Sequence, residues 1–161
     1  MLKIKHKKII ILVSQIIFLI FSSIYLFFRP FFITKVVGKS MEPSLLEGQI
    51  VLASSLDKNY SIGDVVLVNH EQEVLIKRIA YVPGQKILIC NLGWREFCPI
   101  PPMKDVEKQI KILNSSGVHT YIYKIPKNHF FVIGDNETIS EDSRNFGAIP
   151  KEEIFAKILE K

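Results

Sequence analysis

A loop of short polar residues follows residues 130–133 and carries the groups in this sequence best suited to chemistry. The apolar run before it predicts a buried strand, and Gly134 begins the loop. A strand that ends in short polar groups is a typical place for catalytic residues, although the same pattern also fits a solvated hairpin loop. Two earlier segments favour the catalytic interpretation. The loop's polar side chains are those of Asp135, Asn136, Ser140, Asp142, Ser143 and Arg144.

The first of these segments is a turn around Ser40. Gly38 and Pro43 bracket this serine, and such bracketing suits a tight, exposed turn. A serine hydroxyl at this position could act as a nucleophile. Its own backbone N–H is a candidate donor to an oxyanion.

The second segment is the predicted strand 74–82, which contains Lys77 and Arg78. At period two, each face of this strand is apolar apart from one cation. Burying an unpaired charge costs several kcal/mol, so both cations need an explanation. Arg78 keeps its proton and therefore needs a carboxylate, whereas Lys77 can become neutral.

A serine in a tight turn and a lysine on an apolar strand are the components of a Ser-Lys dyad. A free lysine has a pKa of about 10.4, and a base that works near neutral pH needs a value lower by about 2–3, which corresponds to about 3–4 kcal/mol. Desolvation by Leu75, Ile79 and Tyr81 would act in that direction. Lys77 would then accept the proton of Ser40 during attack on an amide carbonyl.

The loop residues can support such a dyad. Ser140 could hydrogen-bond the lysine amine, and Asp135 or Asp142 could balance Arg78 or Arg144. A histidine base is the alternative, but no histidine is embedded in an apolar strand as Lys77 is. The histidines considered are His70, His119 and His129.

The elements that must position these groups are short strands separated by Gly, Pro and Asn turns, which predict a mostly β domain. We expect strands near 49–54, 65–68, 74–82, 86–90, 118–125 and 130–133, and a strand or short helix at 154–159. Residues 91–117, rich in proline and then in charge, read as a small insertion of irregular structure. No strong amphipathic helix is predicted outside the membrane.

An uncharged apolar run at residues 9–28 precedes this domain. Twenty helical residues span about 30 Å, enough to cross a hydrocarbon core. The run continues to Phe28 without a small-x-small cleavage site, which favours a retained anchor over a cleaved leader. The predicted organisation is a basic N-terminus at 1–8, a transmembrane anchor at 9–28 and a domain at 29–161 that carries the candidate dyad.

Charge and cysteine usage exclude some partners. The 161 residues have a net charge of +5, and Lys3, Lys5, Lys7 and Lys8 account for four of these charges. The positive-inside tendency places those lysines in the cytoplasm and the domain outside. The remainder, near +1, shows no nucleic-acid footprint. Cys90 and Cys98 lack the further ligands of a closed zinc site but could close a loop as a disulfide in an extracytoplasmic domain.

In chain order, these segments resemble the motifs of the type I signal peptidases. The resemblance rests on Gly38-Lys39-Ser40-Met41-Glu42-Pro43-Ser44, Gly63-Asp64-Val65-Val66, Lys77-Arg78-Ile79 with Pro83-Gly84, and Gly134-Asp135-Asn136 with residues 140–147. It implies that Ser40 is the nucleophile, Lys77 the general base and Ser140 its orienting residue. It also implies supporting ion pairs among Asp135, Asp142, Arg78 and Arg144.

The resemblance further implies a signal-peptidase-like β-fold domain outside the plasma membrane. The expected substrates are exported preproteins, bound extended and cut after a small-x-small sequence without a metal or cofactor. Four positions depart from the family pattern: Gly38 replaces a serine that can supply a second oxyanion donor, Ser44 a threonine, Gln85 an aspartate and Glu137 an arginine.

Three alternatives remain at this point. A dedicated conjugation- or secretion-system peptidase that matures a pilin-like substrate would share the dyad. A self-cleaving Ser-Lys repressor would carry a DNA-binding segment instead of an anchor. A silent, membrane-anchored interaction module would be expected to lose the serine or the lysine, and both are present.

Overall fold

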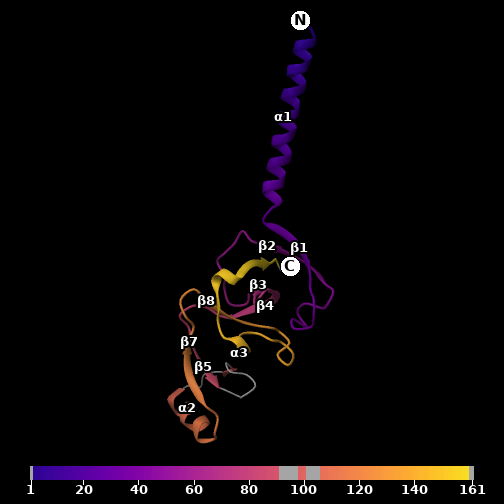
Figure 1. Cartoon of the computed structure of the whole chain (residues 1–161). Helices are drawn as coiled ribbons and strands as arrows, with labels where there is room; N and C mark the ends of the chain where they lie inside the picture. The colour runs from indigo at the N-terminus through magenta and orange to yellow at the C-terminus, as the bar shows by residue number, and fades with distance from the viewer. Residues whose placement is uncertain (1, 91–97, 101–105, 160–161) are drawn as a thin grey trace. The chain divides into compact units, whose positions relative to one another are not determined.

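The computed structural model describes residues 2–90, 98–100 and 106–159, which form two compact units, Met1–Phe32 and Ile33–Lys161. The first unit contains α1 (Leu2–Phe28), which Figure 1 shows as one continuous helix. Its residues Ile11–Phe28 are long and apolar enough to cross a membrane, and none of this span is buried. Arg29 and Pro30 follow, and proline cannot extend the helix because it lacks an N–H.

The second unit is built on a seven-stranded sheet in the order β1-β2-β10-β3-β4-β8-β9, which confirms the mostly β prediction (Figure 1). From β2 to β9 the neighbouring strands pair antiparallel. The strands are β1 (Phe31–Lys35), β2 (Ile50–Ser54), β3 (Val65–His70), β4 (Glu73–Tyr81), β8 (His129–Ile133), β9 (Ile149–Pro150) and β10 (Ile154–Ile158). A short 3-10 helix, η1 (Lys151–Glu153), precedes β10.

The β3–β4 hairpin forms the centre of this sheet. Its turn has only two residues, Glu71 and Gln72, both with positive φ (48° and 72°), which matches the twist of the paired strands. The two strands therefore extend closer to the turn, to His70 and from Glu73, than the predicted strands 65–68 and 74–82. The hairpin register places Lys77 opposite Val66 and Arg78 opposite Val65.

Two apolar clusters hold the domain together. The larger packs Tyr60, Val66, Val68, Ile79, Phe130, Val132, Ile149 and Ile154 on the Lys77 side of the hairpin. The smaller joins Ile87, Ile89, Ile125 and Phe131. Because Phe131 and Val132 alternate on β8, this strand contributes to both clusters and is fixed on both faces. The loop that follows β8 therefore starts from a rigid position.

The insertion is more regular than predicted. A three-stranded sheet, β6-β5-β7, contains β5 (Lys86–Cys90), β6 (Cys98–Ile100) and β7 (Thr120–Lys124). The helix α2 (Val106–Ser115) packs beside β7 (Figure 1). The prediction of irregular structure without an amphipathic helix was wrong for residues 98–100 and 106–115. Gln109, Ile110 and Leu113 form the more buried side of α2, at helical spacing, while its charged residues are exposed.

Candidate active site

Lys77 lies in the middle of β4 and is buried, with 3% of its surface exposed. Leu75 and Ile79 share its face of the strand and belong to the larger apolar cluster or pack against it. Burial lowers the pKa of the Lys77 amine below its usual value; Asp142 raises it, Arg144 lowers it and Glu141 raises it, and the net shift is downward. The structure thus shifts the pKa of Lys77 in the direction that a neutral general base requires.

Ser140 is the hydrogen-bonding partner of this amine. The Nζ of Lys77 donates to the Oγ of Ser140 at 3.1 Å, and Ser140 is itself buried. Lys77 and Ser140 are 63 positions apart in the chain, and a hydrogen bond between them was predicted from the sequence. A buried hydroxyl in this position restricts the direction in which the amine can point.

The loop around Ser140 is fixed by Asp142. This buried carboxylate caps the short helix α3 (Ser143–Phe146) by accepting from the backbone N–H of Arg144 at 3.1 Å. It also accepts from the backbone N–H of Gly134 at 2.9 Å. The hydroxyl of Ser143 accepts from the N–H of Val132 at 3.0 Å, so the loop is attached to β8 at a second point.

Arg144 completes the loop through a buried ion pair with Asp142. Its Nε and Nη2 donate to the two carboxylate oxygens at 2.8 Å and 2.7 Å, and the two side chains are only 4% and 0% exposed. Burial raises the pKa of Asp142, but hydrogen bonds from Arg144, Ser140 and the Gly134 backbone outweigh it, and the pKa is lowered. Asp142 is therefore a carboxylate at neutral pH.

Arg78 forms a second ion pair on the other face of β4. Its Nε and Nη2 donate to the Oδ1 and Oδ2 of Asp135 at 2.8 Å and 2.7 Å, and its Nη1 donates to the carbonyl of Gly63 at 2.7 Å. The sequence left open which carboxylate balances which arginine. The structure pairs Asp135 with Arg78 and Asp142 with Arg144.

Gly134 is the point at which the serine turn and the loop meet. A Cβ at this position would lie 2.6 Å from the carbonyl oxygen of Ser40 and would also collide with the side chain of Ser140. The register pairs Ile133 with Arg78, so Gly134 follows directly beside Lys77. Ser40, Lys77 and Ser140, the three predicted residues of the dyad region, thus come together around a position where only glycine fits.

Two buried apolar side chains anchor the serine turn to the domain. Met41 and Leu45 are buried, and the N–H of Leu45 donates to the carbonyl of Met41 at 2.9 Å. The carbonyl of Ser40 accepts from the N–H of Asn136 at 2.9 Å. Among the described residues, the N–H of Ser40 donates to no backbone carbonyl, and it remains a candidate oxyanion donor. Gly38 adopts a positive φ of 79° two residues earlier.

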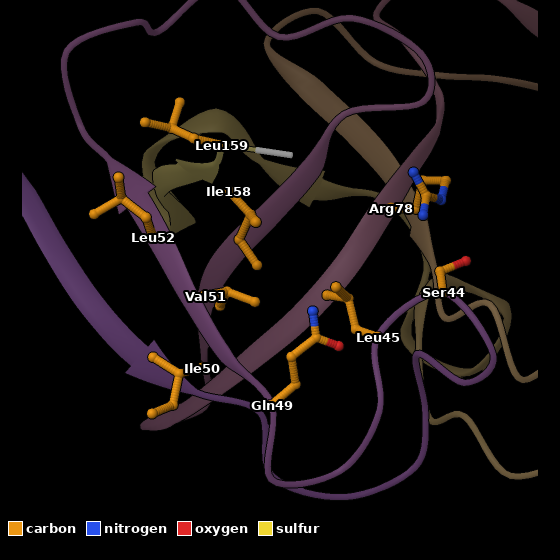
Figure 2. Close-up of a pocket in the computed structure, with 9 residues that line it drawn as sticks. All are labelled: Ser44, Leu45, Gln49, Ile50, Val51, Leu52, Arg78, Ile158 and Leu159. Atoms are coloured by element: carbon orange, nitrogen blue, oxygen red, sulfur yellow. The ribbon is translucent and has the colours of Figure 1, made fainter. Parts of the chain in front are cut away.

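Two cavities meet beside this turn. The smaller, of about 390 Å³, is lined by Ile133, Gly134, Asp135 and Glu137, among others, and so adjoins Gly134, against which Ser40 lies. The larger, of about 710 Å³, lies over β2 and the end of β10, and Figure 2 shows its mainly aliphatic lining. Ser44 and Arg78 line both cavities.

Two of the histidines considered as alternative bases make their described contacts away from Ser40 and Lys77. His70 contacts Glu153 at 2.7 Å and stacks on Phe146, and the ring of His129 contacts the carbonyl of Lys127. Among the described residues, no group of three or more His, Cys, Asp or Glu side chains could hold a metal ion.

The predicted disulfide concerns Cys90 and Cys98. The register of β5 and β6 places them directly opposite each other. The side chain of Cys98 lies outside the described residues, so the disulfide stays a prediction.

Sequence reasoning assigned no role to two hydroxyl residues that the structure connects to the site. Ser143 binds β8 as described above, and Ser44 lines the same cavity as Asp135 and helps to lower the pKa of that carboxyl. For Ser143, its place just after the helix-capping Asp142 was an available signal. Nothing in the spacing of Ser44 indicated this position.

Comparison with known proteins agrees with this geometry. A family model described as signal peptidase, peptidase S26, matches residues 6–160. The chain is 27% identical over 159 residues to signal peptidase I U of Bacillus subtilis strain 168, which covers 92% of this chain and 83% of that protein. It is 31% identical over 140 residues to signal peptidase I V of the same strain, covering 77% and 81%.

A plant relative is similar to the same degree. The mitochondrial ATP-independent inner membrane protease subunit 1b of Arabidopsis thaliana is 32% identical over 135 residues, covering 80% of this chain and 68% of that protein. The matches define the class of the protein as a serine peptidase, a hydrolase. Within that class, the chain belongs to the signal peptidase family, peptidase S26.

Proposed function

We propose that this protein removes N-terminal signal peptides from exported preproteins, with Ser40 as nucleophile and Lys77 as general base. The observation that supports this proposal most directly is the buried Lys77 amine, whose pKa is lowered and whose position is restricted by Ser140. Ser40 lies against Gly134, the residue beside Lys77. The names of the relatives support the same activity.

The proposed reaction has two halves. Neutral Lys77 accepts the proton of the Ser40 hydroxyl as Oγ attacks the scissile carbonyl carbon, and the N–H of Ser40 stabilises the oxyanion. The Lys77 ammonium then returns the proton to the leaving amine, and an acyl-enzyme forms. In the second half, Lys77 takes a proton from the water that attacks the ester, and the Lys77 ammonium returns it to the Oγ of Ser40 as the signal peptide is released.

The substrate is proposed to bind as an extended strand. β8 pairs with β4 only from Arg78 onward, so the Glu73–Lys77 half of β4 has an edge that β8 leaves uncovered. An extended peptide can add to such an edge through main-chain hydrogen bonds while cavities receive its side chains. The smaller cavity beside Gly134 is suited to a side chain close to the cleaved bond.

Residues 9–28 are proposed to anchor the protein in the plasma membrane, with the domain at 29–161 on the outer side. Support comes from the exposed apolar span Ile11–Phe28 of α1 and from the lysines before it. In this arrangement the lipid bilayer is a partner, and preproteins would reach the site from the membrane.

The test is cleavage of a preprotein with a small-x-small site by the full chain in detergent. Lys77→Met keeps the apolar stem of the side chain and removes the amine, so it should abolish cleavage, as should Ser40→Ala. Lys86→Met, on the exposed start of β5, is the matched control and should cut like the parent. Cleavage by a folded Lys77→Met variant would refute the dyad.

The same assay separates the alternatives. A folded parent that cuts only a pilin-like substrate would indicate a dedicated conjugation- or secretion-system peptidase. A folded parent that cuts neither substrate would refute the proposed function and leave the silent interaction module.

A further inference from the structure

Gln15 is a polar residue within the apolar span of α1. The span runs from Ile11 to Phe28, and none of it is buried in the protein. Gln15 lies near its N-terminal end, and at about 1.5 Å per residue its Cα is about 7 Å from the middle of the span along the helix axis. When this span crosses a bilayer, as proposed above, the side-chain amide of Gln15 is surrounded by hydrocarbon.

The amide of Gln15 has no hydrogen-bonding partner among the described residues. The neighbouring hydroxyl of Ser14 differs, because it donates to the carbonyl of Ile11 at 2.8 Å within the helix. An amide has two N–H donors and a carbonyl acceptor, and placing such a group in an apolar medium without hydrogen bonds is unfavourable. The helix therefore presents an unsatisfied polar group to the bilayer.

An open depression adjoins Gln15 on the surface of α1. It has a volume of about 420 Å³ and is lined by Ser14, Gln15, Phe18 and Leu19. Residues three and four positions apart are neighbours on a helix surface, so Phe18 and Leu19 lie on the same side of α1 as Gln15. Side chains of a second helix pack into depressions of this kind. The amide is thus part of a surface against which another helix can pack.

We infer that this face of α1 binds the same face of α1 in a second copy of the chain, with the two Gln15 amides hydrogen-bonded to each other. Copies of one chain have the same orientation in the membrane, so their α1 helices are parallel and their Gln15 side chains lie at the same depth. Each amide has both donors and an acceptor, so two of them satisfy each other across a twofold axis. Glutamine side chains stabilise helix pairs in membranes through such bonds.

A purely apolar helix fits this face less well. The apolar segment of a preprotein could fill the depression, but it would offer the Gln15 amide no side-chain hydrogen bond. The amide therefore favours a second copy of the chain over the substrate. The inference rests on the proposed membrane anchoring of residues 9–28 and goes beyond the proposed peptidase reaction, which uses other residues.

The first experiment is sedimentation equilibrium of the full chain in detergent, at several ratios of protein to detergent. The parent should form dimers. Gln15→Leu keeps a side chain of similar size and should raise the dimer dissociation constant about tenfold, because the bonds between the two amides are lost. Gln15→Asn keeps an amide and should remain near the parent value. Ile24→Ala is the control, since nine positions at about 100° per residue place it on the opposite side of α1.

The second experiment tests the face by cysteine cross-linking in membranes. Cys90 and Cys98, the two cysteines of the chain, are first replaced by alanine. Leu19→Cys lies on the Gln15 face and should form a disulfide between two copies on oxidation. Ile17→Cys lies about 200° around the helix from Gln15 and should not. Adding Gln15→Leu should lower the yield of the Leu19→Cys cross-link.

Three results would each overturn the inference: a monomeric parent, a Gln15→Leu dimer as tight as that of the parent, or equal cross-linking by Leu19→Cys and Ile17→Cys. Cross-linking of Leu19→Cys only to a preprotein with a cysteine in its apolar segment would assign the face to the substrate and would also overturn it.

Alkaline extraction of membranes separates this inference from the proposed anchoring. A chain that is extracted has no membrane anchor, and the pairing of α1 helices then fails with the anchoring. A chain that stays in the membrane fraction but is monomeric refutes the pairing alone. Cleavage of the small-x-small preprotein, measured in parallel, tests the proposed peptidase reaction independently of both.

Discussion

The ion pair of Arg144 with Asp142 predicts a large and specific loss of stability when it is broken. Arg144→Met keeps much of the side-chain volume and removes the guanidinium, which leaves a carboxylate that is 0% exposed without its countercharge. Breaking a buried pair in this way costs about 3–5 kcal/mol. Domains are stable by about 5–15 kcal/mol, so the loss should be a large fraction of the total.

Asp142→Asn should also lower the free energy of unfolding, because the buried Arg144 then loses its two short bonds to Asp142 and keeps the longer contact of its Nη1 with Glu137 Oε2 at 3.6 Å. The double variant removes both charges and should lose less than the sum of the two single losses. The assay is urea unfolding of the full chain in detergent, followed by far-ultraviolet circular dichroism.

A second ion pair in the same domain serves as the control. Lys157 Nζ lies 2.7 Å from Asp64 Oδ1, but these side chains are 27% and 16% exposed. A partly exposed pair contributes about 0–1 kcal/mol, so Lys157→Met should shift the unfolding free energy by no more than that. Equal losses in Arg144→Met and Lys157→Met would refute the reasoning that burial sets the cost.

Two further predictions concern geometry. Gly134→Ala should abolish cleavage, because its Cβ would lie 2.6 Å from the Ser40 carbonyl oxygen and displace the turn; a folded alanine variant with the parent rate contradicts this. Cys90 and Cys98 should form a disulfide in protein isolated from its own compartment, since directly opposite residues on antiparallel strands have Cα atoms about 4.5–5.5 Å apart, within the disulfide range. Mass spectrometry after alkylation, with and without reduction, checks this, and two alkylated thiols before reduction would exclude it.

The sequence predicted the parts of the site whose physical requirements are local. An apolar strand containing Lys77, a bracketed Ser40 and a polar loop after a buried strand are each visible within a few residues. The approach of Ser140 to Lys77 could be expected because the buried amine needs a hydrogen-bonding partner, and the structure contains it at 3.1 Å. Short strands separated by turn residues likewise predicted a mostly β domain.

The pairing of charges could not be read from the sequence, because it depends on strand register. Arg78 binds Asp135 because β8 lies beside the second half of β4, with Ile133 opposite Arg78. A shift of one residue would turn Arg78 to the other face. Two carboxylates in one loop offer no local signal for choosing between two arginines.

The insertion was mispredicted because its prolines and charged residues are typical of irregular structure, whereas its helical periodicity is short and weak. In α2, Ile110 and Leu113 recur at helical spacing, but the helix has only 10 residues, and most of its neighbours are polar. A helix this short is marginal by itself and is stabilised by packing, here beside β7. That contact comes from the fold and is absent from the local sequence.

Arg144 and Asp142 also affect the pKa of the proposed base, Lys77, in opposite directions. This difference allows an effect on catalysis to be distinguished from a loss of stability. Asp142 raises the pKa of Lys77, and Arg144 lowers it. Arg144→Met should therefore raise the pKa of Lys77 and move the rising limb of the pH–rate profile to higher pH, because less of the amine is neutral at a given pH. Asp142→Asn removes the raising charge and should move the limb to lower pH. Both variants lose stability, so damage to the fold alone would not shift the two profiles in opposite directions. The measurement is kcat/KM as a function of pH for both variants, under conditions in which both remain folded. If the rising limbs of the two pH–rate profiles move in the same direction, Lys77 is excluded as the group that titrates.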